Sequence, residues 1–260
     1  MKVTILGARG SVPTDGKEMI EYGGATSSVL IETEEEAIFL DAGTGILKAP
    51  DIKDRNISIL ISHPHADHLL GLPFFPYINR NKRINIYSFA DGKITTAEQI
   101  GRYLSPPLWP CTLDDYPADI HCIDMTLPFT VGNVNVSGIR SNHPGGSTIF
   151  RVESCNRSVV YATDYEHSTE ADAKLIGLCE HADLLLYDGQ YTDDEYELKK
   201  GFGHSTSRHG SYIMKESNAA MLRIVHHDPL HDDRMLKAME DEIRSQSVAF
   251  AREGEVICIQ

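Results

Sequence analysis

The sequence lacks several features that would place it in a special class of protein. It has no apolar run near the ~20 residues that a membrane-spanning helix requires, and residues 1–14 lack the apolar core and cleavage site of a signal peptide. The five cysteines are odd in number and show no CxxC spacing: Cys111, Cys122, Cys155, Cys179 and Cys258. These features argue against a disulfide framework and a structural zinc site. We therefore expect a cytoplasmic protein without a membrane partner.

Positive charge is also scarce. The chain has 24 Lys and Arg against 38 Asp and Glu, a formal net charge of -14. Such a surface repels a phosphate polymer unless a local basic or metal site reverses the field. The only local basic cluster is NRNKR, residues 79–83. The charge therefore disfavours a nucleic-acid polymer as partner, while a small anionic substrate at a cationic site remains compatible.

Short apolar, β-branched runs recur along the 260 residues, and each has the length of a strand. They lie at 3–6, 28–33, 37–40, 57–62, 84–87, 134–139, 148–152, 159–163, 184–187, 222–225 and 256–259. Helical patterns are found at 67–75, 94–104, 169–181, 205–217 and 231–245. Strands follow one another in the first half and alternate with helices in the second, which predicts two sheets with helices outside.

One segment fits neither a helix nor a central strand. Residues 105–119, SPPLWPCTLDDYPAD, contain four prolines and the only tryptophan, Trp109. The segment is either a packed surface loop or a lid or wall of a pocket. Trp109 is correspondingly either a packing residue or a face on which a base could stack.

The motif SHPHADH, residues 62–68, follows directly on the predicted strand 57–62. In extended chain, residues i and i+2 face the same side, so His63 and His65 can point at one position. Asp67 and His68 can address a second position beside it. Imidazole and carboxylate together suit Zn²⁺, and also Mn²⁺ or Fe²⁺. The motif therefore predicts a metal site at the end of this strand.

Further ligand-type residues close other predicted strands. They are His143, Asp164 and either His226 or His227, of which only one should bind because neighbouring side chains alternate between faces. Asp41 and Asp188 also end strands, as turn caps or as partners that orient a metal-bound histidine. His204 lies in GHSTS, before a helix start that Ser205 and Thr206 could cap.

The motif SHPHADH resembles the HxHxDH motif of the metallo-β-lactamase superfamily. The segments GARGSVPT, YGGATSS, DAGTG and GHSTS are similar to the branch that holds ribonuclease Z and the cyclic-nucleotide phosphodiesterases, and the likeness runs from Lys2 to about Asp232. The resemblance implies an α/β (α+β) fold, the four-layer αββα sandwich, formed by one domain over residues 1–260. It also implies a homodimer.

The resemblance implies two divalent metal ions per chain, with Zn²⁺ favoured over Mn²⁺ or Fe²⁺. His63, His65 and His143 would hold the first ion, Asp67, His68 and His226 the second, and Asp164 would bridge both. A hydroxide between the ions would attack a phosphodiester. Two residues would be catalytic: His204 as proton donor to the leaving group and Asp67 as a carboxylate that positions the nucleophile.

These features predict a metal-dependent phosphodiesterase for a small phosphodiester, with a cyclic nucleotide as the first choice. A ribonuclease Z-like enzyme that processes the 3′ end of tRNA is the alternative, although the flexible arm of those enzymes is not visible in the sequence. A metal-binding sensor without turnover is a third interpretation.

Overall fold

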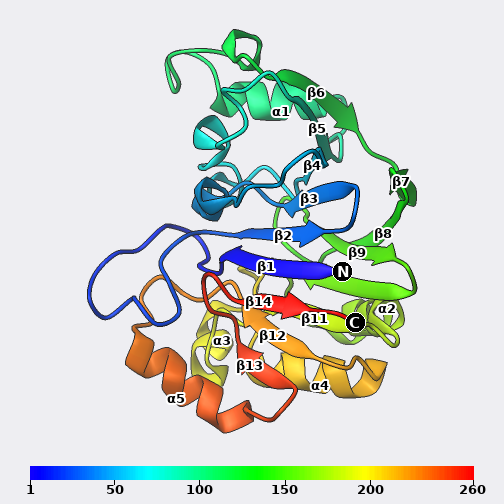
Figure 1. Cartoon of the computed structure of the whole chain (residues 1–260). Coiled ribbons are helices and arrows are strands. Elements are labelled where there is room, and N and C mark those ends of the chain that lie inside the picture. Colours follow the sequence, from blue (N-terminus) through cyan, green and yellow to red (C-terminus); the bar gives the residue numbers. More distant parts are fainter.

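Two seven-stranded sheets face each other in the computed structural model, which describes residues 1–260 (Figure 1). In spatial order the first sheet contains β14 (Val256–Cys258), β1 (Lys2–Gly7), β2 (Ser28–Glu32), β3 (Glu36–Leu40), β4 (Asn56–Leu60), β5 (Arg83–Ser88) and β6 (Asp119–Asp124). The second contains β13 (Val248–Phe250), β12 (Leu222–Val225), β11 (Leu184–Asp188), β10 (Arg157–Ala162), β9 (Thr148–Ser154), β8 (Val134–Arg140) and β7 (Phe129–Val131). The strands from β3 to β6 are parallel, as are those from β10 to β13.

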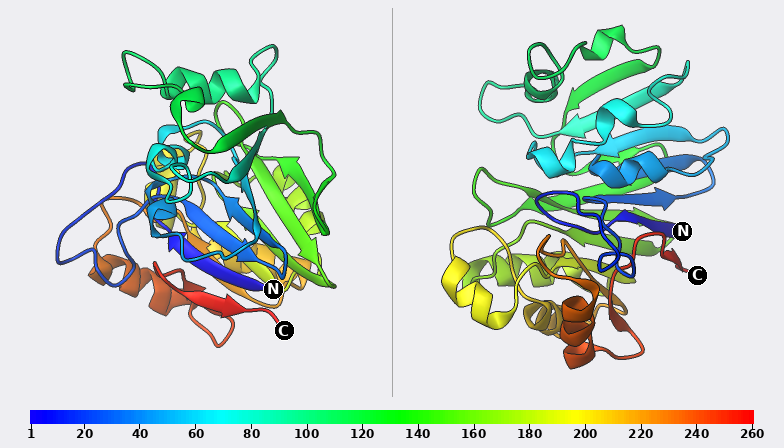
Figure 2. Two further views of the ribbon diagram at one scale, coloured as in Figure 1. Left: turned by 45° about the horizontal axis from the view of Figure 1, so that its top comes forward. Right: turned by 90° about the vertical axis from the view of Figure 1, so that its left-hand side faces the viewer.

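Helices cover the outer faces of the sandwich. The helices are α1 (Thr96–Tyr103), α2 (Thr169–Cys179), α3 (Asp193–Lys199), α4 (Ser207–Ser217) and α5 (Asp233–Ile243). Shorter 3₁₀ turns lie at η1 (Thr44–Lys48), η2 (Ala66–His68), η3 (Leu72–Phe74) and η4 (Leu113–Asp115). In Figure 1, α1 lies at the top and α3, α4 and α5 lie at the bottom, and Figure 2 shows the sheets between them from two further sides.

Three apolar clusters hold these layers together. The central one joins the inner faces of both sheets, so Val3 and Ile5 of β1 share a cluster with Phe150 and Val152 of β9. The i, i+2 spacing in each strand reflects the alternation of side chains across a sheet. A second cluster covers the outer face of the first sheet, and a third packs α2, α4 and α5 onto the second sheet. Each fully buried aliphatic or aromatic side chain contributes about 1.5–3 kcal/mol to the stability of the fold. Both faces of each sheet bury such side chains, so each sheet is covered by the other sheet on one face and by helices or loops on the other.

The prediction of an αββα sandwich is confirmed, and each of the eleven predicted strands is present. The short strands β7 and β13 and the edge strand β6 were not predicted, because three residues or a half-exposed edge give no clear apolar pattern. Helix α3 was also missed. Its sequence DDEYELK buries only Tyr196, and its start is fixed by a capping box between Thr192 and Glu195.

The predicted helix at 67–75 is wrong. Only the 3₁₀ turns η2 and η3 form there, because Gly71 interrupts the segment and Pro73 cannot donate a helical hydrogen bond. The predicted helix at 205–217 begins later, at Ser207, with Thr206 as its cap: the Thr206 side chain accepts from the His209 amide. Ser205 does not cap it. Its hydroxyl instead contacts His167 and Tyr187.

The segment 105–119 is a surface loop with a single 3₁₀ turn, as its prolines predict. The ring of Trp109 packs edge-on against Phe74 at 5.4 Å between centroids, on the cluster that covers the first sheet. Its indole N–H donates to the Tyr116 hydroxyl at 2.9 Å. Trp109 is thus engaged in packing, and its contacts do not support the alternative of a base-stacking face.

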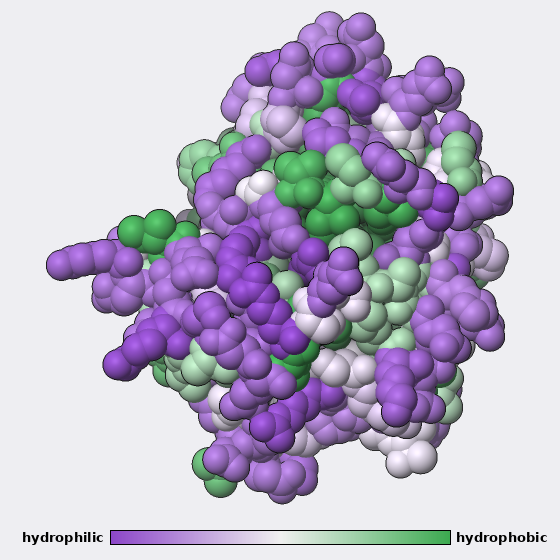
Figure 3. Space-filling view, turned by 60° about the horizontal axis from the view of Figure 1, so that its bottom comes forward, coloured by the Kyte–Doolittle hydropathy of each residue, from purple (hydrophilic) through white to green (hydrophobic).

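No helix is both long enough and apolar enough to cross a membrane. The face in Figure 3 is mostly hydrophilic, with its main hydrophobic group in the upper centre and smaller ones scattered around it. This agrees with the acidic composition of the chain.

Helix α5 is anchored by a buried carboxylate. Glu240 is 0% exposed and accepts from the Tyr22 hydroxyl at 2.9 Å, the Phe250 amide at 3.0 Å and two Arg252 nitrogens at 3.1 and 2.9 Å. Burial favours the neutral acid, but the Arg252 contact and the other hydrogen bonds lower the pKa of Glu240 to about 2. Glu240 therefore stays ionised across the ordinary pH range.

We expect Glu240→Gln to lower the free energy of unfolding at pH 7 by about 3 kcal/mol, since it removes the buried carboxylate that pairs with Arg252 and leaves Arg252 only its more exposed partner Glu21. Because the folded pKa of Glu240 is depressed, its contribution is complete above about pH 4.5, the unfolded pKa. It is lost as the pH falls towards 2. Urea unfolding at pH 7 and pH 3 should therefore show a smaller difference between variant and wild type at pH 3.

The control is Glu242→Gln on the same helix. Glu242 pairs with Arg208 at the surface, so its loss should change stability by less than about 0.5 kcal/mol. Equal effects of the two substitutions would contradict the role of Glu240.

Candidate metal centre

All the ligand-type residues identified in the sequence come together at one edge of the sandwich. His63, His65, Asp67 and His68 follow β4 of the first sheet, while His143, Asp164 and His226 follow β8, β10 and β12 of the second. These four strands point the same way, so the residues after their carboxyl ends meet at the same edge. Burial of the apolar strands determines where the strands end, and the polar residues that follow them therefore lie at this edge of the sandwich.

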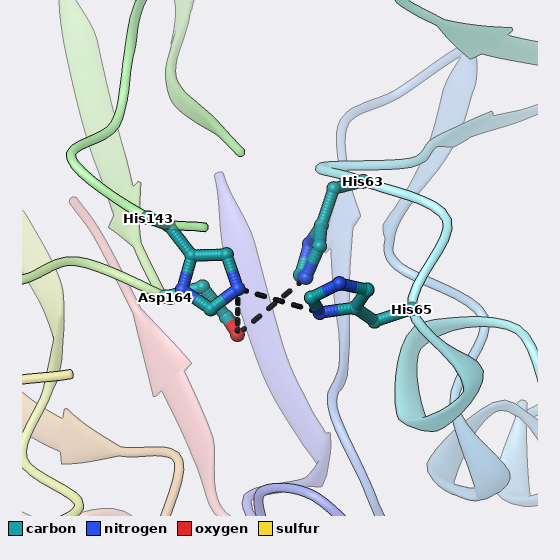
Figure 4. Close-up of side chains that lie close together, drawn as sticks. All are labelled: His63, His65, His143 and Asp164. Carbon is teal, nitrogen blue, oxygen red and sulfur yellow. Dashed lines mark hydrogen bonds and ion pairs between the residues drawn. The ribbon is translucent and has the colours of Figure 1, made fainter. Parts of the chain in front are cut away.

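The first group contains His63, His65, His143 and Asp164, whose ligand atoms lie within 4.8 Å of one another (Figure 4). Asp164 Oδ1 lies 3.6 Å from His63 Nε2 and 3.8 Å from His143 Nε2. His143 Nε2 lies 3.3 Å from His65 Nδ1. His65 is exposed, whereas the side chain of His143 is only 3% exposed. The group therefore opens to solvent at His65, which is the side from which a substrate can approach.

The second group contains Asp67, His68 and His226, all buried. Asp67 Oδ2 lies 3.2 Å from His68 Nε2 and 3.3 Å from His226 Nε2. Asp164 Oδ2 faces the same two nitrogens at 3.2 and 3.4 Å. The two oxygens of Asp164 therefore face different groups, which is the arrangement that a bridging ligand requires.

The charges and unpaired atoms of the site fit two divalent cations. His63 Nε2 and His68 Nε2 are buried and make no hydrogen bond, which is costly for a polar atom unless a ligand satisfies it. Burial lowers the pKa of His226, but Asp164, Asp67 and Asp188 outweigh burial and raise it to about 9. The negative charge of these carboxylates favours the binding of cations at the site. Nitrogen and oxygen donors of this kind suit zinc, manganese or iron.

Asp41 lies behind the second group, where a partner that orients a metal ligand should lie. Asp41 Oδ2 is 2.7 Å from His68 Nδ1 and also accepts from the hydroxyls of Ser62 and Tyr161 at 2.9 and 3.0 Å. His68 Nδ1 therefore carries the proton when Nε2 binds a metal. The backbone of Asp41 has φ 63°, a left-handed conformation that it shares with Asp164 and His226. Strain of this kind is common at functional sites.

The structure distinguishes the neighbours His226 and His227. His226 faces Asp67 and Asp164, whereas His227 points into the protein, with Nε2 2.9 Å from the Ala251 carbonyl and its ring stacked on Phe250. Burial lowers the pKa of His227 to about 3. It is therefore a neutral packing residue.

His204 lies beside both groups. Its Nδ1 is 2.8 Å from Asp188 Oδ2, its ring stacks on His226 at 4.8 Å between centroids, and it meets the ring of His143 edge-on at 5.2 Å. Gly203 permits this packing. Its φ is +91°, and a Cβ there would lie 2.1 Å from His143 Nδ1. His204 also lies within 4.8 Å of Asp164 and His226, so it can reach a group bound between them.

The start of α4 offers few free backbone amides to a bound anion. The amide of Ser205 donates to Asp188 Oδ1 at 3.4 Å, and the amide of His209 donates to the Thr206 cap. These amides are used inside the protein, so His204 is the better supported contact for a substrate.

An αββα sandwich with two adjoining His/Asp groups at one sheet edge defines a metallo-β-lactamase-type metalloprotein. The chain belongs to the metallo-β-lactamase superfamily: residues 36–227 match the β-lactamase superfamily domain. That match contains every proposed metal ligand, and the family implies divalent metal ions at this site.

The chain is also similar to individual proteins. It is 26% identical to ribonuclease Z of Thermoplasma volcanium over 298 residues, which cover 95% of this chain and 92% of the relative. The fold is shared with the metallo-β-lactamase fold protein YhfI of Bacillus subtilis, with a TM-score of 0.75, 21% identity and 98% of each chain covered. It is also shared with the short form of human tRNase Z, with a TM-score of 0.72, 23% identity and 100% of each chain covered.

These relatives are at odds with one expectation. The acidic composition disfavoured a nucleic-acid polymer, yet the curated relatives include ribonuclease Z of several organisms. Net charge reports the average field of the whole surface, and a metal site can reverse that field locally. The charge therefore does not settle the substrate class.

Proposed function

We propose that this chain is a two-metal phosphodiesterase that hydrolyses a small phosphodiester, with a cyclic nucleotide as the first substrate to test. The observation that carries the proposal is the placement of His204, held by Asp188 beside the carboxylate that faces both ligand groups. We further propose Zn²⁺ as the resident ion, with Mn²⁺ or Fe²⁺ as alternatives.

In this proposal His63, His65 and His143 hold one ion, Asp67, His68 and His226 the other, and Asp164 both. When bound, two divalent cations activate water near neutral pH and neutralise the charge of a phosphate. Asp67 accepts a hydrogen bond from the attacking water and orients it. The side chain of His204 supplies the proton that the leaving oxygen needs, and Asp188 keeps its ring in place.

The position of the basic cluster supports a small substrate. Residues 79–83 directly precede and begin β5, at the amino ends of the parallel strands, whereas the ligand groups follow the carboxyl end of the neighbouring β4. A strand of five residues spans roughly 16 Å, so this cluster lies at the opposite edge of the sheet from the metal centre. Arg80 in addition stacks over the ring of Tyr77. These charges do not line the route to His204.

Ribonuclease Z-like processing of tRNA is the second candidate, and the curated relatives favour it. The alignment with the Thermoplasma volcanium protein runs over 298 positions, more than the 260 residues of this chain, so the relative carries insertions that this chain lacks. The absence of these insertions and the distance of the basic cluster from the metal centre support the small substrate over this candidate.

A comparison of substrates tests the proposal. Zinc- or manganese-loaded protein should hydrolyse a cyclic nucleotide or a linear bis-ester with a higher kcat/KM than a precursor tRNA. Between 50 and 200 mM salt the rate on the small ester should change less than about twofold, whereas a protein that grips six to ten phosphates loses about 10³–10⁵ in affinity.

A triple variant, Arg80→Gln with Lys82→Gln and Arg83→Gln, is the matched control. It should leave the hydrolysis of the small ester unchanged. Efficient 3′ cleavage of precursor tRNA, with a steep salt dependence and a loss in the triple variant, would overturn the proposal in favour of the nuclease.

A further inference from the structure

Gln190 contacts the side of His226 that faces away from the metal centre. His226 is 1% exposed, and its Nε2 points at Asp67 and Asp164 while its Nδ1 lies 3.1 Å from Gln190 Oε1. Gln190 is itself only 4% exposed and follows the end of β11. A buried amide in contact with a buried imidazole restricts how that imidazole can turn.

The other end of the Gln190 amide leads back to the same metal position. Its Nε2 donates to Ser11 Oγ at 3.3 Å, and the Ser11 backbone amide donates to Asp67 Oδ2 at 2.8 Å. Asp67 Oδ2 in turn faces His226 Nε2 at 3.3 Å. Ser11, Asp67, His226 and Gln190 therefore form a closed ring of polar contacts, which we call the Gln190 ring.

The Gln190 ring depends on close packing of the loop that carries Ser11. The backbone of Ser11 has φ 63°. The preceding residue, Gly10, packs directly against the imidazole of His226. A Cβ at this position would lie 2.4 Å from His226 Nδ1, so only glycine fits. The loop thus covers the face of the histidine and places the Ser11 amide on Asp67.

We propose that Gln190 is a positioning residue that fixes the tautomer and orientation of His226 and couples them to Asp67. When His226 Nε2 binds a metal, Nδ1 must carry the proton, and the amide oxygen of Gln190 at 3.1 Å accepts it, since Asp188 Oδ2 is farther away at 3.9 Å. The amide nitrogen then faces Ser11 Oγ, as observed. The inference rests on the proposed two-metal site and extends to no particular substrate.

The contact between Gln190 and His226 also gives His226 and His204 separate hydrogen-bond acceptors. Asp188 Oδ2 lies 3.9 Å from His226 Nδ1 and holds His204 Nδ1 at 2.8 Å. Without the oxygen of Gln190, the N–H of His226 would turn towards Asp188 and compete with His204. Gln190 therefore leaves Asp188 free to orient His204 for proton transfer while His226 binds the metal.

The test measures zinc binding by competition with a chromophoric chelator. Gln190→Leu removes both polar atoms at similar volume. We expect the zinc-binding step assigned to Asp67, His68 and His226, here called the second step, to lose about 10- to 100-fold in affinity, the usual effect of removing such a partner. The other step, assigned to His63, His65 and His143, should not change. Gln190→Glu still accepts from His226, so its second step should stay within about threefold of wild type.

The order of the two variants separates positioning from packing. If Gln190 only filled space, leucine would be tolerated and a buried carboxylate would be the worse substitution. Histidine ¹⁵N NMR of the zinc-loaded protein gives an independent readout: the hydrogen-bonded Nδ1–H signal of His226 should be retained in Gln190→Glu and shifted or lost in Gln190→Leu. If Gln190→Leu does not fold, Gln190→Met replaces it, with the same expected loss.

Wild-type binding of both zinc ions together with unchanged binding in Gln190→Leu would overturn this inference alone. A weaker second step in Gln190→Glu than in Gln190→Leu would also overturn it. Binding of only one zinc ion by the wild-type chain would instead contradict the proposed two-metal site itself.

Discussion

Asp164→Ala should abolish stable binding of both metal ions and lower kcat/KM for a small phosphodiester by at least about 10³-fold, since metal catalysis is worth several kcal/mol. Asp164 is buried, and its two oxygens face different histidine pairs: Oδ1 faces His63 and His143, and Oδ2 faces His68 and His226. Burial raises the pKa of Asp164, but the charges of the surrounding histidines lower it well below its ordinary value. The carboxylate is therefore ionised at neutral pH, as the proposed ligand role requires.

Elemental analysis after dialysis measures this effect. The wild-type protein should contain close to two equivalents of metal, and the variant substantially less than one. His227→Ala is the matched control, because it removes a buried histidine next to His226 that points away from the site. It should retain both ions, with any loss confined to stability. Full metal content in Asp164→Ala, or loss of metal in His227→Ala, would contradict the assignment.

His204→Ala should lower kcat by about 10²–10⁴-fold, the usual effect of losing a general acid, without changing the metal content. The alanine cannot donate a proton to the leaving oxygen. The loss should be much smaller for an ester of p-nitrophenol, because that leaving group departs without protonation. Steady-state kinetics on both ester types, with metal analysis of the same samples, measure the effect.

Asp188→Asn provides the accompanying variant. It keeps the shape of the side chain behind His204 but removes the carboxylate that holds His204 Nδ1 at 2.8 Å, so it should lower kcat in the same direction and by a smaller factor. An equal loss for activated and ordinary esters would indicate that His204 serves binding or structure. Loss of metal in His204→Ala would indicate that it is a ligand, a role that its distance from Asp164 and His226 also permits.

The sequence by itself determined the sandwich and singled out the residues that we propose as metal ligands. Apolar runs reported the strands because each lies against another layer, and ligand-type residues directly after four of these runs had to meet once the strand ends met. The motif at residues 62–68 is local, so its spacing alone oriented His63 and His65 towards one position. The resemblance then placed His143, Asp164 and His226 in their order.

Only the tertiary structure decided the details of the site. The inward direction of His227, the opposite directions of the two Asp164 oxygens and the bond between His204 and Asp188 depend on the packing around each of these residues. Gln190 left no signal in the sequence, since its partner Ser11 lies 179 residues away. Left-handed backbone at Asp41, Asp164 and His226 aims these side chains. Local propensity disfavours such conformations, and only the surrounding packing stabilises them.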